Sequence, residues 1–225
     1  MRFSLQRFLS TLGISLLIAI FVLAVTYRAS ESNAPVTLDF PDALVVQVRD
    51  ETKTESISFV VTNAGANWFA LPRSLVVADA PLRITVNELS NGILTDAVRS
   101  TFSSLLGRDE VDVWQLDATA LSALVEVIGG YEVDGVRLNG NQAIENLRLN
   151  EPGARGRFLQ MWREIVTSLD AGELTAVLTN LGSTSRSNLS IESLVSIFGS
   201  MQAQSQVSIF QLFEVKSIRG TVNGR

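Results

Sequence analysis

The chain has 225 residues, a net charge of −5, and neither histidine nor cysteine. These absences exclude disulfides, thiol catalysis, a Ser-His-Asp triad, and metal sites built from histidine or cysteine. The net negative charge argues against nucleic acid as the main partner. Sixteen arginines accompany only two lysines, so arginines, carboxylates and hydroxyls remain as the groups available for chemistry.

An apolar N-terminal segment predicts a membrane anchor. Residues 8–27 carry no charge, and about 20 such residues span a bilayer as a helix. Arg2 and Arg7 precede this run, so the positive-inside rule keeps the N-terminus in the cytoplasm and the rest of the chain outside. A cleaved signal peptide is the alternative, although its apolar core is usually shorter. We predict a cytoplasmic tip and retained single-pass anchor over 1–28, a polar linker over 29–41, and one domain over 42–225.

Three apolar runs begin this domain and predict three adjacent strands. They cover Ala43–Val48, Ile57–Thr62 and Trp68–Leu71. A turn rich in asparagine and glycine separates the second run from the third. Asp50 and Glu55 lie in or beside the loop between the first two runs. Solvation of that turn is the simplest explanation of Asp50 and of Glu51 beside it.

The middle of the domain alternates helices and strands, with capping and turn residues between them. Apolar residues at helical spacing mark the helices, and short apolar runs mark the strands. Aspartate before a helix and glycine after one are common end signals. The predicted elements are a helix over 93–106, a strand over 111–116, a helix over 118–128 capped by Asp117, and a hairpin of 131–133 with 136–138 around Asp134-Gly135.

Residues 138–169 are the most informative stretch, because arginines gather where a polar loop joins two predicted helices. Arg148, Arg155, Arg157 and Arg163 lie in or beside this loop. Guanidinium groups make planar, bidentate contacts with phosphate, and the start of a helix offers backbone N–H groups to an anion. The stretch therefore fits a phosphate or pyrophosphate cradle. Simple solvation of the helix ends is the alternative.

The last part of the chain predicts two helices and a strand. Helices are expected over 172–181 and 189–201, with a polar loop between them and Ser187 or Asn188 as the second cap. An apolar run over 207–215 predicts a final strand. Because strands and helices alternate along the domain, the predicted class is α/β, with a mixed central sheet flanked by helices.

Three sequence motifs occur in a fixed order along the domain. The run LPRS at 71–74 reads as a turn after a strand. The run VDVWQLDATALSALVEVIGGYEV at 111–133 reads as strand, helix and double glycine. The run LNGNQAIENLR at 138–148 is followed by Gly156-Arg157 at the start of the next helix. Together these runs resemble, in order, motifs of the LytR-CpsA-Psr (LCP) family.

The resemblance implies an LCP-type α/β domain outside the cell membrane of a Gram-positive bacterium. It also implies a glycopolymer transferase, which takes a polymer from a polyprenyl-pyrophosphate lipid and transfers it to peptidoglycan or a related acceptor. By motif position, Arg73, Arg148 and Arg157 would be catalytic and would bind the pyrophosphate. Arg155 and Gln160 complete the implied substrate-binding set. The prenyl tail would lie in an apolar tunnel between the sheet and the helices.

The sequence also departs from the family pattern at acidic positions. Family members bind Mg²⁺ through acidic residues in a longer loop between the first two strands. Asp50 and Glu55 are the nearest candidates for this role here. Ser74 and Ala154 stand where the family carries aspartates. An active transferase is therefore one hypothesis, and a catalytically impaired relative that binds a lipid or partner and modulates envelope assembly is the second. An unrelated extracytoplasmic α/β domain is the third.

Overall fold

The computed structural model describes residues 41–50, 55–77, 84–86, 88, 93–207 and 211–214. The predicted anchor and almost all of the predicted linker fall outside these residues, so both stay predictions. Among the helices of the described ranges, none combines the length and the apolar character that crossing a bilayer requires. All described residues belong to one of the two units of the chain, Asp39–Arg225.

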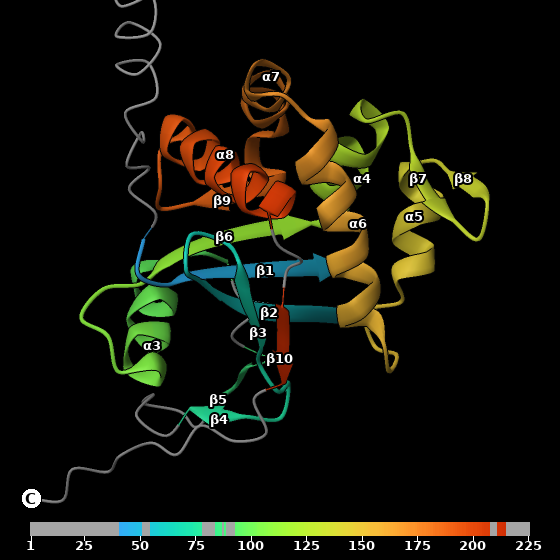
Figure 1. The fold of residues 1–225 in the computed structure, drawn as a ribbon. Coiled ribbons are helices and arrows are strands. Elements are labelled where there is room, and N and C mark those ends of the chain that lie inside the picture. Colours follow the sequence, from blue (N-terminus) through green and yellow to red (C-terminus); the bar gives the residue numbers. More distant parts are fainter. Residues whose placement is uncertain are drawn as a thin grey trace, which may run out of the picture. The chain divides into compact units, whose positions relative to one another are not determined.

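A six-stranded mixed sheet forms the centre of this unit, in the order β10-β3-β2-β1-β6-β9 (Figure 1). β1 pairs antiparallel with β2 and parallel with β6. β3 pairs antiparallel with β2 and parallel with β10, while β9 forms the opposite edge, antiparallel to β6. The predicted α/β class with a mixed sheet is thus confirmed. The strands are β1 Leu44–Asp50, β2 Glu55–Thr62, β3 Asn67–Ala70, β6 Asp112–Asp117, β9 Ser185–Ser187 and β10 Gln211–Glu214.

Side-chain alternation along the inner strands builds a separate core on each face of the sheet. Val46 and Phe59 point to one face, which α4 to α8 cover (Figure 1). Val45 and Val60 point to the other face and pack with Phe102 of α3. The two-residue period of a strand produces this division. The helices are α3 Asp96–Leu106, α4 Ala118–Val127, α5 Gly140–Leu147, α6 Ala154–Ser168, α7 Ala171–Leu181 and α8 Ile191–Val207.

A cluster of buried aromatic rings fixes α6 against the sheet. Trp162 of α6 contacts Trp68, Trp114, Phe158 and Phe198, with ring centroids 5.5 to 6.2 Å apart. All five side chains are almost fully buried. Each such pair adds roughly 0.5–1.5 kcal/mol beyond the burial of apolar area. Because α6 is held this firmly, its N-terminus keeps a fixed place beside β3.

Local turn chemistry confirms several predicted boundaries. Asp117 caps α4, its carboxylate accepting the N–H of Ala120 at 2.8 Å. Gly107 ends α3 in the left-handed conformation. The predicted hairpin forms from β7, Tyr131–Val133, and β8, Val136–Leu138, around Asp134 and Gly135, which both have positive φ.

The segment between α7 and α8 differs from the polar loop that the sequence predicts. It contains a 3₁₀ turn, Gly182–Thr184, followed by β9 at the sheet edge. Two further short strands, β4 Val76–Val77 and β5 Ile84–Thr85, were also not predicted. Strands of two or three residues are too short to show an alternating pattern, and β9 is polar throughout. Pairing with a neighbouring strand, rather than local sequence, creates them.

α8 begins and ends later than the sequence predicts. Ser190 is its cap, with its hydroxyl oxygen accepting the N–H of Ser193 at 3.2 Å. The predicted caps, Ser187 and Asn188, instead hydrogen-bond to β6. The helix then continues to Val207, where the sequence predicts the start of the C-terminal strand, and β10 lies within that predicted strand.

Candidate functional site

The N-terminus of α6 lies at the end of the tight loop that follows α5. Gly153 is its N-cap residue, with a φ of 89°, and the helix has no side-chain cap. The first N–H groups of a helix have no partner within the helix, and the helix dipole makes this end positive. Ala154 donates its N–H to the Glu151 carbonyl at 3.2 Å, which closes the preceding turn. The helix start therefore suits an anionic group.

A cavity of about 560 Å³ opens at this helix start. Its wall includes Arg73, from the turn after β3, and Arg155, from the first turn of α6. Asn150 and Glu151 of the preceding loop and Gly156 of α6 also line it, with leucine and isoleucine side chains on the apolar side. The described side chains in the wall thus carry two positive charges and one negative charge. The cavity favours an anion.

Arg73 is held in the cavity wall by Asn150. Its Nη1 atom donates to Asn150 Oδ1, and the amide nitrogen of Asn150 donates in turn to Glu55 Oε1. The Nε atom of Arg73 is buried and has no hydrogen-bond partner in the described part of the chain. Burial lowers the pKa of the Arg73 guanidinium, while Glu55 raises that pKa and Arg155 lowers it. An anion in the cavity would stabilise the charged guanidinium.

Arg155 reaches back to the same turn that carries Arg73. Its Nη2 atom donates to the carbonyl of Leu71 at 3.4 Å, two residues before Arg73. This contact draws the first turn of α6 toward the end of β3, so the two guanidinium groups come from different elements to one cavity. Like charges repel, and an anion bound beside both would remove that repulsion.

Arg157 and Arg148, by contrast, serve the loop between α5 and α6. Arg157 donates from Nε and Nη2 to the carbonyl of Leu147, at 3.1 and 3.0 Å, where α5 ends. Arg148 has a positive φ of 46° and ends that helix. Both guanidinium groups approach Glu151, at 3.3 Å from Arg148 and 3.6 Å from Arg157. The structure therefore brings Arg73 and Arg155 together and places the other two arginines on Glu151.

Gln160, the remaining predicted substrate ligand, is exposed on α6, one turn after Gly156. It is not among the described residues that line the cavity. The catalytic roles predicted for Arg148 and Arg157, and the binding role predicted for Gln160, stay predictions.

The predicted metal ligands, Asp50 and Glu55, are cross-strand partners at the last pair of β1 and β2. Asp50 is buried, and Glu55 turns its carboxylate to Asn150. Magnesium in proteins is commonly held by one or two carboxylates together with substrate phosphates. Oxygen donors of this kind fit the ion by type, but the described ranges hold no group of three or more potential ligands. Magnesium binding stays a prediction.

Glycine stands at positions 140 and 156 of the sequence motifs for different physical reasons. A Cβ atom on Gly140 would lie 2.4 Å from the carbonyl oxygen of Ser122, so glycine is needed where α5 packs against α4. Gly140 also donates its N–H to Glu126 Oε1 at 2.8 Å. Gly156 lines the cavity, and a Cβ atom there would meet nothing within 4 Å. The first glycine therefore serves packing, whereas the second leaves space in the cavity.

Asn150 is the cavity residue that sequence reasoning missed. Asparagine in a loop between two helices reads as an ordinary turn residue. Its side chain bridges Arg73 and Glu55, which lie 77 and 95 positions earlier in the sequence. No local sequence pattern indicates such distant contacts.

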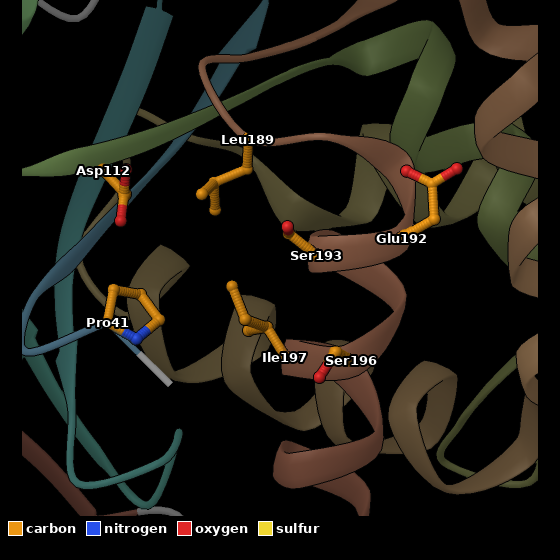
Figure 2. A pocket seen from close by; sticks show the side chains of 7 residues that line it. All are labelled: Pro41, Asp112, Leu189, Glu192, Ser193, Ser196 and Ile197. Carbon is orange, nitrogen blue, oxygen red and sulfur yellow. The ribbon is translucent and has the colours of Figure 1, made fainter. Parts of the chain in front are cut away.

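A second cavity, of about 400 Å³, lies between the start of β6 and α8 (Figure 2). Its polar wall includes the carboxylates of Asp112 and Glu192 and the hydroxyls of Ser193 and Ser196. The carboxylates would repel an anion. A third cavity, of about 630 Å³ and mainly apolar, lies between α4 and α7. Among these three cavities, the one at α6 has two arginines and a helix start in its described wall.

Solved structures share this fold. The transcriptional regulator EF0465 from Enterococcus faecalis matches with a TM-score of 0.58 and 15% sequence identity, over 79% of this chain and 78% of that one. TagV from B. subtilis matches with a TM-score of 0.57 and 12% identity, over 77% and 84% of the two chains. TagT bound to LI-WTA matches with a TM-score of 0.56 and 14% identity, over 77% of each chain. No family model and no curated protein matches the sequence. The predicted likeness to LCP proteins is thus confirmed for the fold, which this chain shares with TagV and TagT.

Proposed function

We propose that this protein binds the pyrophosphate of a polyprenyl-linked glycopolymer at the α6 cavity and transfers the polymer to peptidoglycan or a related acceptor. One observation carries the proposal: Arg73, Arg155 and the uncapped start of α6 face the same cavity. The ligand of TagT, LI-WTA, supports the substrate class because TagT has the same fold.

The proposed reaction is a phosphoryl transfer. A hydroxyl oxygen of the acceptor forms a new bond to the phosphorus that carries the glycopolymer, and the bond to the second phosphate breaks. Polyprenyl phosphate leaves, and the hydroxyl proton passes to a base. Such reactions depend mainly on positioning and on neutralising charge, which guanidinium groups and a helix start supply. Magnesium held by Asp50 and Glu55 would add further neutralisation of phosphate charge.

A second candidate function is binding without turnover. The observation that favours it concerns Glu151, the carboxylate among the described lining residues, because Arg148 and Arg157 both approach it. Arg148 approaches one oxygen of this carboxylate and Arg157 the other, so both arginines compete with the acceptor hydroxyl for it. In this case the protein would hold the lipid-linked polymer, or a partner that carries it, and modulate envelope assembly.

The decisive experiment uses the full chain in detergent with a polyprenyl-pyrophosphate-linked glycan, a peptidoglycan fragment and Mg²⁺. Mass spectrometry follows the release of polyprenyl phosphate. Release that is lost in Arg73→Ala and Arg155→Ala, and kept in Arg163→Ala on the same helix, supports a transferase. Bound lipid without release supports the second candidate. Unchanged release in the Arg73→Ala, Arg155→Ala double variant refutes transfer at this cavity.

We also propose that residues 8–27 anchor the protein in the membrane, with the domain outside. The uncharged run in the sequence supports this. Intact protein should stay in the membrane pellet after carbonate extraction. Recovery of a shortened protein in the soluble fraction would mean that the segment is a cleaved signal peptide.

A further inference from the structure

Asn150 separates a carboxylate from a guanidinium at the edge of the α6 cavity. Its amide nitrogen donates to Glu55 Oε1, and its amide oxygen accepts from Arg73 Nη1. Asn150 itself lines the cavity. One neutral side chain therefore hydrogen-bonds to both charged groups and lies between the carboxylate and the guanidinium.

The loop that carries Asn150 is firmly built. The N–H of Glu151 donates to the carbonyl of Arg148 at 2.9 Å, which closes a tight turn around Asn150. Arg148 and Arg157 both approach the side chain of Glu151, and Arg157 also binds the end of α5. These contacts hold the amide of Asn150 at a fixed place between β2 and the turn after β3.

The amide matters because Arg73 needs its charge for an anion. Glu55 is the carboxylate whose charge acts on Arg73, where it raises the guanidinium pKa against the effect of burial. A carboxylate in direct contact would pair with the guanidinium and compete with any anionic ligand. An amide accepts the Arg73 hydrogen bond without neutralising its charge.

We infer that Asn150 is a positioning residue that keeps Glu55 off Arg73 and so preserves the positive charge of the cavity for a pyrophosphate-type anion. The inference rests on the proposed function, because it assigns Asn150 a part in binding the same anionic headgroup. The contrasting explanation is that Asn150 contacts the ligand directly, as any polar side chain in a cavity wall can.

A double-mutant cycle separates the two explanations. Calorimetry measures the affinity of the full chain in detergent for inorganic pyrophosphate. Asn150→Ala should weaken binding roughly fivefold, about the strength of one partly exposed ion pair. The titrations contain EDTA and no Mg²⁺, so the proposed magnesium role of Glu55 does not enter, and Glu55→Gln should bind at least as tightly as the native protein. In the Glu55→Gln background, Asn150→Ala should have no further effect, because no carboxylate remains to close on Arg73.

Equal weakening by Asn150→Ala in both backgrounds would overturn the inference in favour of direct contact. No weakening in either background would overturn it as well. Asn180→Ala, an exposed asparagine on α7 away from this cavity, is the matched control and should leave the affinity unchanged. Thermal unfolding of every variant shows that the fold is intact.

A second measurement decides the role of Asn150 even if the native protein does not bind pyrophosphate, which by itself would refute only the proposed function. Phenylglyoxal reacts with the neutral form of a guanidine group. A carboxylate in contact favours the charged form and therefore slows the reaction. Peptide mass spectrometry follows the modification of Arg73. Asn150→Ala should slow the modification roughly fivefold. In the double variant that also carries Glu55→Gln, the native rate should return. An unchanged rate in Asn150→Ala would mean that Glu55 does not close on Arg73.

Discussion

Replacement of Gly156 tests whether the cavity at α6 is the binding site without disturbing the fold. Gly156 lies in the first turn of α6 and lines the cavity, and a Cβ atom there meets nothing within 4 Å. Its φ is not positive, so an L-residue fits the backbone. Gly156→Leu therefore adds a side chain at the cavity wall, and its Cβ atom has open space around it.

The expected stability change is small and favourable. Replacing glycine in a helix contributes roughly 0.5–1 kcal/mol, and less near a helix end. For a domain of this size, 1 kcal/mol corresponds to about 2–4 °C in melting temperature. Gly156→Leu should therefore melt at the native temperature or slightly above it. Its affinity for pyrophosphate should fall at least tenfold, about 1.4 kcal/mol, because the leucine occupies space beside Arg155.

The matched control is Gly199→Leu on α8, where a Cβ atom also meets nothing within 4 Å and which does not line the cavity. It should gain roughly 0.5–1 kcal/mol, because it lies in the middle of its helix, and keep the native affinity. Calorimetry with pyrophosphate and thermal unfolding measure both quantities on the same samples. Native affinity in a folded Gly156→Leu variant would refute the assignment of the anion to this cavity.

Four further predictions concern single side chains. Arg155→Ala should lose anion affinity with only a small loss of stability, because it removes one long hydrogen bond to Leu71. Arg157→Ala should destabilise the fold by about 1–3 kcal/mol in urea unfolding, because the end of α5 loses its donors. Trp162→Ala should cost about 3–5 kcal/mol by the same measurement, because the variant empties the centre of the ring cluster. Burial, with a smaller effect of Glu164, raises the pKa of Tyr131 above its usual 10.0. The unfolded chain therefore releases that proton first, so stability should fall as the pH rises above about 10, and Tyr131→Phe should reduce this loss.

The sequence predicts those parts of the fold that local patterns determine. Buried strands such as β1 and β2 are long apolar runs, and Asp117 and Gly107 mark helix ends by chemistry that acts over three or four residues. β9 escapes prediction because its three polar residues become a strand only by pairing with β6. The cap of α8 escapes prediction for a similar reason: Ser187 and Asn188 are also good capping residues, but both hydrogen-bond to Val113 of β6.

Sequence alone also does not predict which arginines of the candidate site share one cavity. The sequence places four arginines near one loop and cannot say which of them face the same space. An α-helix turns roughly 100° per residue, so two residues correspond to roughly 200°. Arg155 and Arg157 therefore point to different sides of α6. Arg155 faces the turn after β3, and Arg157 faces the end of α5. A headgroup-sized anion beside Arg155 is therefore not expected to touch Arg157.

Arg157 can nevertheless affect binding through the loop that it supports. It holds the end of α5 and approaches Glu151, and the same turn presents Asn150 to Arg73. A variant at Arg157 should therefore lose affinity and stability together, while a variant at Arg155 loses mainly affinity. This contrast explains how a motif arginine can be required for binding without contacting the ligand. Loss of affinity in Arg157→Ala at a native melting temperature would instead mean that Arg157 reaches the anion itself.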